Sequence, residues 1–236
     1  MKQIRAVLKE KIVRTETTQS FRFVPAEKVV FMPGQFLQVI FDPQEANNKE
    51  LNKYLSFSSS PHKEYIEVTK RLSESQFSQK LKGLNPGDEV LLEAPMGNCV
   101  FKDEYKEIGF LIGGIGITPV ISIIEYIMER KIDTDVVLFY SNRTPEEAAF
   151  KKELDSWRSI NKNIKIIFTV TDRQPEDAAY IFGRINADLL GQERWRLKER
   201  VLFIFGPPKM VGAMNNLCLE LGCSKESLKI ENFIGY

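Results

Sequence analysis

GFLIGGIGITPVISIIEYIMER, from Gly109 to Arg130, is the stretch of sequence that decides the fold. It starts as an apolar run, breaks into glycines, meets Pro119 and resumes with the apolar spacing of a helix. The stretch is just long enough for a membrane span, which needs about 20 apolar residues. The glycines, Pro119 and the charged Glu125 interrupt it, so we expect no membrane span. The remaining interpretations are a buried piece of core and a loop built to approach a phosphate.

Composition and charge limit the size of the domains and the kind of partner. The 236 residues suit one large domain or two small ones, and 43% of them are hydrophobic, which is enough for real cores. The formal net charge of +1 gives no overall field that would favour nucleic acid or an anionic membrane. We therefore expect no nucleic-acid partner.

Cysteine and histidine usage excludes several kinds of chemistry. Cys99, Cys218 and Cys223 form no CxxC motif, so we expect neither a metal site nor an iron–sulfur cluster. An odd, sparse set of cysteines fits a reducing cytosol, and the N-terminus has no signal-peptide core, so we expect a cytoplasmic protein. The single histidine, His62, follows a proline in a turn-like stretch, which indicates a loop residue rather than a catalytic base.

Residues 1–103 have the pattern of short β-strands. Apolar and polar residues alternate in IRAVLKEKIVRTETTQSFRFVP, PGQFLQVIF and EYIEVTKR, and turn residues separate these segments. This pattern is typical of an antiparallel barrel or sandwich. One short helix is expected at SQFSQKLKGL, with Phe77, Leu81 and Leu84 on one face.

Residues 104–236 have a different rhythm, in which apolar strands alternate with helices. Strands are expected at EIGFLIGG, TDVVLFYSN, IKIIFTVT, RVLFIFG and SLKIENF, and helices at TPVISIIEYIMERK, TPEEAAFKKELDSWRS and PKMVGAMNNLCLELG. Continuous apolar strands alternating with helices predict a parallel sheet covered on both faces. We therefore expect two domains, a β domain over 1–103 and an α/β domain over 104–236.

Two glycine loops follow strands of the second half. Gly114 and Gly116 lie where a buried strand meets a helix, and there glycines let the backbone approach a phosphate. Gly206 and Pro207 occupy the same kind of place after a later strand. Pro119 replaces the third glycine of a GxGxxG motif, and either loop alone could be an ordinary tight turn. Two such loops at the carboxyl edge of one sheet indicate one extended ligand.

A run of hydroxyl side chains, NKYLSFSSSP, marks the first half. Lys53 can pair with a phosphate, and Ser56, Ser58 and Ser59 can donate hydrogen bonds to a polar heteroaromatic edge. The alternative is a polar strand end and turn, because small hydroxyl residues are common before proline.

The order of these motifs resembles that of a known family. KYLSFSS, GIGITP, GPPKM and ENF follow one another as in the ferredoxin–NADP reductase superfamily, and the similarity covers essentially the whole chain. The resemblance implies an FAD-binding antiparallel β-barrel followed by a nicotinamide-binding α/β domain, with FAD and NAD(P)H as cofactors. It also implies a member without an iron–sulfur domain of its own.

The resemblance implies flavin-binding roles in the first half. Lys53 and Leu55 stand where the family motif RxYSxxS has an Arg that pairs with the pyrophosphate and a Tyr that covers the flavin ring. Tyr54 is the alternative covering residue if the register shifts. Ser56 and Ser59 match the serines, and Ser56 is expected near flavin N5. The further flavin contacts implied are Val68, Thr69 and Lys70 along the ribityl chain and pyrophosphate, and Ser75 and Ser78 at a phosphate turn.

The same resemblance implies nicotinamide-binding roles in the second half. The residues implied are Gly114, Gly116 and Thr118 in the first glycine loop and Gly206, Pro207 and Met210 in the second. Phe205 replaces the cysteine that usually precedes the second loop, so the usual sulfur contact is not expected. Glu231 and Phe233 match the Glu-x-aromatic ending, which places the Glu near N5 and the ring on the flavin face. Tyr236 is a rival for this covering role.

These roles predict hydride transfer between NAD(P)H and bound FAD, with Ser56, Glu231 and Phe233 as catalytic residues. Because the chain lacks metal ligands of its own, the electrons would pass to a separate acceptor. A ferredoxin, a flavodoxin, an oxygenase component and a small molecule all fit.

Coenzyme choice depends on the ends of two strands. Ser141, Asn142 and Arg143 follow the second strand of the α/β half, and no acid among them would bind a ribose diol. Arg173 follows the third strand and could add charge toward a 2′-phosphate. This pattern favours NADPH slightly, and an ordinary surface arginine is the alternative.

Two other functions fit the same residues. One is a flavin-binding electron-transfer subunit of a larger complex, with little or no turnover alone. The other is a ligand-binding or regulatory module that has lost hydride transfer, which the departures at Lys53, Leu55 and Phe205 favour. The retained Ser56 and Glu231 argue against this second alternative.

Overall fold

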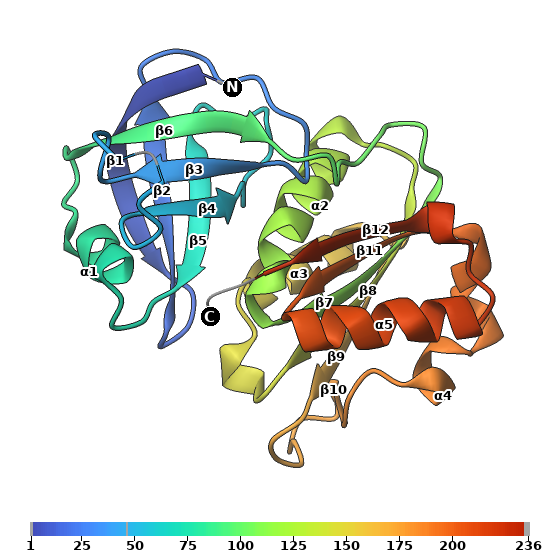
Figure 1. The fold of residues 1–236 in the computed structure, drawn as a ribbon. Coiled ribbons are helices and arrows are strands. Elements are labelled where there is room, and N and C mark those ends of the chain that lie inside the picture. The colour runs from blue at the N-terminus through green and yellow to red at the C-terminus, as the bar shows by residue number, and fades with distance from the viewer. Residues whose placement is uncertain (1, 46, 234–236) are drawn as a thin grey trace. The chain divides into compact units, whose positions relative to one another are not determined.

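The computed structural model describes residues 2–45 and 47–233, which divide into two compact units. The first unit runs up to Phe101 and includes Thr118–Tyr126. The second comprises Lys102–Ile117 and the described residues from Ile127 onward. Figure 1 shows a β-rich first unit and an α/β second unit, as the sequence predicts.

The first unit is a six-stranded antiparallel sheet curled into a nearly closed barrel. Its strands are β1 (Lys2–Val13), β2 (Thr18–Pro25), β3 (Phe36–Ile40), β4 (Asn52–Ser56), β5 (Ile66–Arg71) and β6 (Glu89–Met96). Their order is β4-β3-β6-β1-β2-β5, and a bridge between Phe57 and Val68 joins the two edges. The predicted antiparallel barrel is therefore confirmed.

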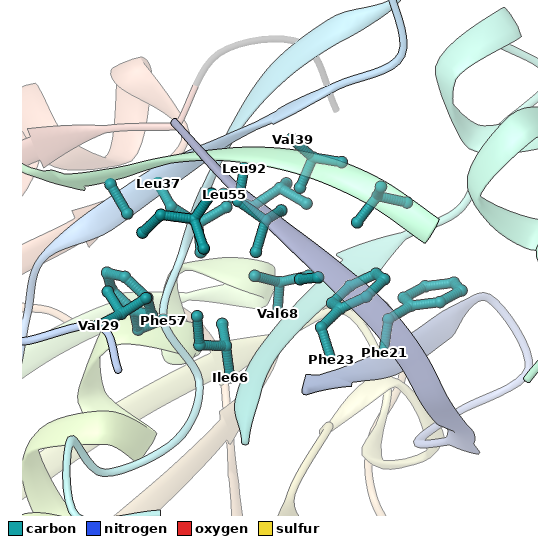
Figure 2. Close-up of a cluster of buried hydrophobic side chains, with 14 of the residues drawn as sticks. Phe21, Phe23, Val29, Leu37, Val39, Leu55, Phe57, Ile66, Val68 and Leu92 are labelled. Carbon is teal, nitrogen blue, oxygen red and sulfur yellow. The ribbon is translucent and has the colours of Figure 1, made fainter. Parts of the chain in front are cut away.

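Alternation along the strands builds the barrel core. Side chains from one face of each strand meet in the interior, as Figure 2 shows for Phe21, Phe23, Leu37, Leu55, Val68 and Leu92. The short helix α1 (Gln76–Gly83) adds Phe77 and Leu81 to this core, and both are fully buried. The pattern of apolar residues in SQFSQKLKGL thus predicted the helix and its buried face.

The second unit contains a six-stranded sheet whose strands are all parallel. The strands are β7 (Glu107–Gly113), β8 (Asp135–Asn142), β9 (Ile164–Val170), β10 (Tyr180–Phe182), β11 (Val201–Gly206) and β12 (Leu228–Asn232), in the order β10-β9-β8-β7-β11-β12. The helices are α2 (Thr118–Arg130), α3 (Lys151–Ile160), α4 (Ala187–Leu190) and α5 (Pro208–Glu220). Figure 1 shows α5 on one face of this sheet and α3 on the other, so the predicted covered parallel sheet is confirmed.

The helix expected from Thr144 to Ser159 is wrong in its first half. The structure has a 3-10 turn over Pro145–Glu147, and α3 begins only at Lys151. Phe150 lies between the 3-10 turn and α3 with φ 62°. This left-handed backbone conformation is incompatible with a continuous helix through residue 150. Ala148, Ala149 and Phe150 are all buried, so tertiary packing overrides the local helix signal.

Within the part of the chain that the structure describes, no helix combines the length and the apolar character needed to cross a membrane. The stretch around Gly109 instead supplies β7, a 3-10 turn at Gly114–Ile117 and α2. Fully buried apolar residues dominate its strand portion. It is therefore a piece of core that carries a glycine loop.

Candidate cofactor sites

Two lysines lie close together on β4 and β5 of the barrel. Lys70 is only 5% exposed, and burial together with the nearby charge of Lys53 lowers its pKa to about 8. A buried cation beside a second cation is costly unless an anion joins them. The two lysines are therefore compatible with the flavin pyrophosphate contact that the resemblance implies.

The start of α1, a few residues after Lys70 in the sequence, carries a group of serine hydroxyls. Ser75 is the N-cap, and its Oγ accepts a hydrogen bond from the Ser78 N–H at 3.3 Å. Ser78 Oγ lies 3.0 Å from Ser75 Oγ and 3.2 Å from Ser73 Oγ. Helix N-termini favour negative charge, so this serine cluster is compatible with the predicted phosphate turn.

A buried polar network stabilises β5 and the turn after β4. Thr69 Oγ1 lies 2.7 Å from both Ser20 Oγ and Ser58 Oγ. Glu67 is 2% exposed and accepts hydrogen bonds from Arg14 at 2.8 Å and Arg22 at 2.7 Å. Sequence reasoning did not find this ion-pair network, because its members are far apart in the chain and belong to no motif.

The predicted serines differ in their surroundings. Ser59 Oγ accepts a hydrogen bond from the Glu67 N–H at 3.0 Å, and the Ser59 carbonyl accepts one from Ser122 Oγ at 2.7 Å. Ser59 therefore holds the turn after β4 in place. Ser56 ends β4 and is 5% exposed.

Leu55 and Tyr54 point to opposite sides of β4. Leu55 lies in the barrel core, where Figure 2 shows it among the other buried side chains. Tyr54 is 59% exposed, with its ring edge-to-face against Phe36 at 5.8 Å. Val68 is likewise in the core. Of these two residues, Tyr54 is therefore the one whose side chain is open to a ligand.

The two predicted glycine loops of the second unit touch each other. A Cβ at Gly116 would lie 2.6 Å from the carbonyl oxygen of Phe205, and a Cβ at Gly113 would collide with Met210 Sδ. Gly206 has φ 156°, and its surroundings include the backbone of Gly113. Both loops therefore lie at the carboxyl edge of one sheet, as predicted.

The first loop leads into α2 and leaves room beside it. Gly114 has φ 52°, and a Cβ there would meet nothing within 4 Å. Thr118 begins α2 and is buried, with Pro119 in the first turn. Space beside a glycine backbone before a helix fits a bound pyrophosphate.

The ends of β8 and β9 carry buried polar atoms without partners. Both amide atoms of Asn142 and the hydroxyl of Thr169 are buried with no hydrogen bond within the described structure. Ser141 pairs in register with Thr169, and Arg143 follows at the exposed surface. Orphaned polar groups at this edge fit a polar ligand such as a nucleotide.

Arg173, on which the preference for NADPH depends, has an acidic partner. Its guanidinium lies 2.7 Å from Glu146 Oε1, and both side chains are 65% exposed. Glu146 lies in the loop after β8, in the 3-10 turn that replaces the expected helix start. The pair weakens the argument for a 2′-phosphate site.

Glu231 and Phe233 lie at the end of β12. Burial alone raises the pKa of Glu231 to about 7. The Phe233 N–H donates to the Gly206 carbonyl at 2.9 Å, and its ring lies 6.5 Å from that of Phe205. The ENF ending is thus tied to the second glycine loop. Tyr236, the predicted rival, lies outside the described residues.

Comparison with known proteins defines the class to which these features belong. Residues 5–101 match the model of the oxidoreductase FAD-binding domain, and residues 110–216 match that of the oxidoreductase NAD-binding domain. The chain thus contains both of these oxidoreductase domains, and the lysine pair and the touching glycine loops are compatible with FAD and NAD as their ligands. It belongs to the ferredoxin–NADP reductase superfamily.

Similar proteins differ in how much of their own length this chain matches. NADH-cytochrome b5 reductase 1 of Kluyveromyces lactis is 30% identical, over 91% of this chain and 79% of that protein. Flavohemoprotein A of Dictyostelium discoideum is 24% identical over 96% of this chain, but the match spans only 59% of its own length. The FAD/NAD-binding domain of a Vibrio cholerae nitric oxide dioxygenase has the same fold, with a TM-score of 0.84 at 20% identity and 98% coverage of both chains.

Proposed function

We propose that this chain takes hydride from NADH or NADPH onto bound FAD and passes electrons to a separate acceptor. The observation that carries the proposal is the contact between the two glycine loops, in a chain that also has an FAD-binding domain. Bound flavin would supply the ability to accept a hydride and release single electrons. The protein has to bind and orient the flavin and the coenzyme and to exclude water from the site. The proposal keeps the predicted domains 1–103 and 104–236 as the flavin and nicotinamide parts.

The barrel residues bind and orient the flavin in this proposal. Lys53 and Lys70 neutralise the pyrophosphate, and Ser78 at the start of α1 assists them. Tyr54 replaces Leu55 as the residue that covers the ring, because Tyr54 is the exposed one. Ser56 donates a hydrogen bond near N5.

The second unit orients the nicotinamide. Gly114, with free space beside it, accepts the pyrophosphate, and Thr118 helps to position the ring. Glu231 is half-buried, and with a pKa of about 7 it holds a proton in part of the molecules at neutral pH. A protonated carboxyl can donate a hydrogen bond, which gives Glu231 a polarising role next to the flavin. Phe233 would supply the aromatic ring that lies against the flavin.

The acceptor is proposed as a separate protein or small molecule. The similar proteins are named for cytochrome b5 and for a flavohemoprotein, which indicates that one reductase fold serves several acceptors. A ferredoxin, a flavodoxin, an oxygenase component and a cytochrome are therefore all to be tested. NADH and NADPH are both to be tested as donors, because Glu146 neutralises Arg173.

A second candidate is an electron-transfer subunit that works only inside a larger assembly. The observation in its favour is that the chain matches 59% of the Dictyostelium relative, so a protein of this family can combine these domains with more sequence. Steady oxidation of NADH or NADPH by the isolated chain, with ferricyanide as acceptor, would exclude this candidate. Turnover that appears only after a cellular fraction is added would favour it.

A reducing compartment is proposed for the protein. Cys99, Cys218 and Cys223 form no disulfide among the described residues, and Cys218 and Cys223 are close enough for a thiol–thiol hydrogen bond. The odd, sparse set of cysteines in the sequence fits the cytosol. Localisation of a tagged full-length protein tests this assignment.

The experiment that tests the main proposal is a spectral titration. The purified chain is incubated with FAD, freed of excess cofactor and mixed anaerobically with NADH or NADPH in separate samples. The proposal expects a bound flavin band that either coenzyme bleaches. A protein that takes up no FAD would overturn it, and a yellow protein that neither coenzyme bleaches would leave a binding module.

A further inference from the structure

The amino half of β9 has no neighbouring strand on one side among the described strands. β10 pairs only with Phe168–Val170, so the edge from Ile164 to Ile167 is open there. Figure 1 shows β10 as a short strand beside the longer β9. An open strand edge presents backbone groups that another extended chain can bind.

The alternation of hydrogen bonds identifies which backbone groups are available. The Asn163 carbonyl accepts from the Val136 N–H of the β8 segment at 2.8 Å, and the Val170 carbonyl accepts from Gly183 on the opposite side at 2.8 Å. Successive residues of a strand point their N–H and C=O groups to alternate sides. Ile166 therefore directs both its N–H and its C=O toward the open side.

A basic groove of about 570 Å³ runs along this open edge. Its lining consists of Arg158, Lys162, Ile164, Lys165, Ile166, Ile167, Arg194 and Trp195, with no acidic side chain. Arg158 and Lys165 have carboxylate partners, Asp155 at 2.8 Å and Asp135 at 2.9 Å. Lys162 and Arg194 have none among the described residues, and Arg194 lies 4.2 Å from the centre of the Trp195 ring. The groove thus combines an apolar floor with uncompensated positive charge.

We propose that this groove binds an acidic, extended segment of a partner protein, which adds as a strand to the open edge of β9. Backbone hydrogen bonds to Ile166 would supply register, and Lys162 and Arg194 would select acidic side chains. A second copy of this chain is a poor occupant, because its own edge carries Lys162 and Lys165 and would meet like charges. The groove lies toward the amino end of β9, whereas the glycine loops lie at the carboxyl edge. The groove is therefore a separate site from the glycine loops.

The test uses labelled peptides and the full chain. The probe is a short fluorescent peptide of alternating Glu and Val. One control peptide has Lys in place of Glu, and another has Pro in place of Val, which keeps the charge but removes backbone N–H donors. We expect the first peptide to bind, and both controls to bind at least about tenfold more weakly. Equal binding of the proline peptide would overturn strand addition, and so would binding of an oligonucleotide in place of the acidic peptide.

Variants of the protein locate the binding site. Lys162→Glu and Arg194→Glu are each expected to weaken binding of the Glu–Val peptide about tenfold. The control is Lys152→Glu on the exposed face of α3, which makes the same charge change outside the groove and is expected to leave binding unchanged. Hydrogen exchange of the wild-type chain gives a second readout that needs no variant. Bound peptide should slow exchange at the Ile166 amide, and an unchanged rate at saturation would contradict the proposal.

Discussion

Glu231 has a pKa that burial raises to about 7 from an ordinary value of 4.5. The folded state therefore holds this proton more tightly than the unfolded state, and the stability that results is present below pH 4.5 and lost as pH rises through 7. Glu231→Gln resembles the protonated form at every pH. We expect the variant to be more stable than the wild type by about 1–2 kcal/mol above pH 7, since partial exposure screens the full effect, and equal to it near pH 4.5. Urea unfolding at both pH values measures this, and a difference that does not depend on pH would contradict it.

Lys70 has a pKa lowered to about 8, first by its burial and then by Lys53. A bound pyrophosphate would restore the charge, so FAD binding near pH 8 should take up a proton. We expect Lys70→Met to weaken FAD at least about tenfold, because a charge-assisted contact is lost. Calorimetry in buffers of different ionisation enthalpy measures affinity and proton uptake together. The control is Lys28→Met, an exposed lysine of the same unit. Unchanged FAD affinity in Lys70→Met would place the anion site elsewhere.

Residue types predicted the chemistry of the site better than the direction of each side chain. The sequence places Lys53, Tyr54 and Leu55 in one motif, but which of them faces outward depends on strand register. The structure buries Leu55 in the barrel core and exposes Tyr54. The ion pair of Arg14 with Glu67 was not predicted, because it joins residues that only the folded barrel brings together.

At the scale of elements, the two glycine loops form one structural feature. Ala at Gly116 would place its Cβ 2.6 Å from the backbone oxygen of Phe205, and backbone cannot move aside cheaply. We expect Gly116→Ala to lower the free energy of unfolding by about 1–3 kcal/mol and to weaken NADH and NADPH together. Gly212→Ala in α5 is the matched control, because nothing lies within 4 Å and alanine favours a helix interior. Chemical denaturation and coenzyme titration of both variants measure this. If Gly116→Ala behaved like its control, the loops would not be in close contact.

Elements with a strong apolar pattern were predicted well, whereas the short elements after β9 were not. The strands β7, β9 and β11 and the helices α2 and α5 have strong apolar patterns that follow from burial. The segment from β10 to residue 199 contains only short helices, turns and a short strand. Contacts between these short elements stabilise them, and one such contact is the hydrogen bond from Trp195 Nε1–H to the Leu189 carbonyl at 2.8 Å. Local sequence carries little signal for such pieces. The break before α3 was also missed because tertiary packing, here the burial of Phe150, overrides the local helix signal.

At the scale of the whole molecule, the sequence predicted two parts because the period of its apolar residues changes near residue 103. It did not predict that Thr118–Tyr126 of α2 would group with the barrel unit. There the Ser60 N–H donates to Glu125 Oε2 at 2.7 Å, and Lys63 lies 3.1 Å from Glu125 Oε1. Glu125, which argued against a membrane span, thus stabilises the turn after β4.

The most direct test of hydride transfer is anaerobic stopped-flow reduction of the FAD-loaded chain. NADH or NADPH, unlabelled or deuterated at C4, is mixed with the protein while the flavin band is followed. Our account predicts rapid bleaching that becomes slower with the deuterated coenzyme, because the C4–hydrogen bond breaks in the observed step. A bound flavin whose absorbance neither coenzyme changes would contradict it.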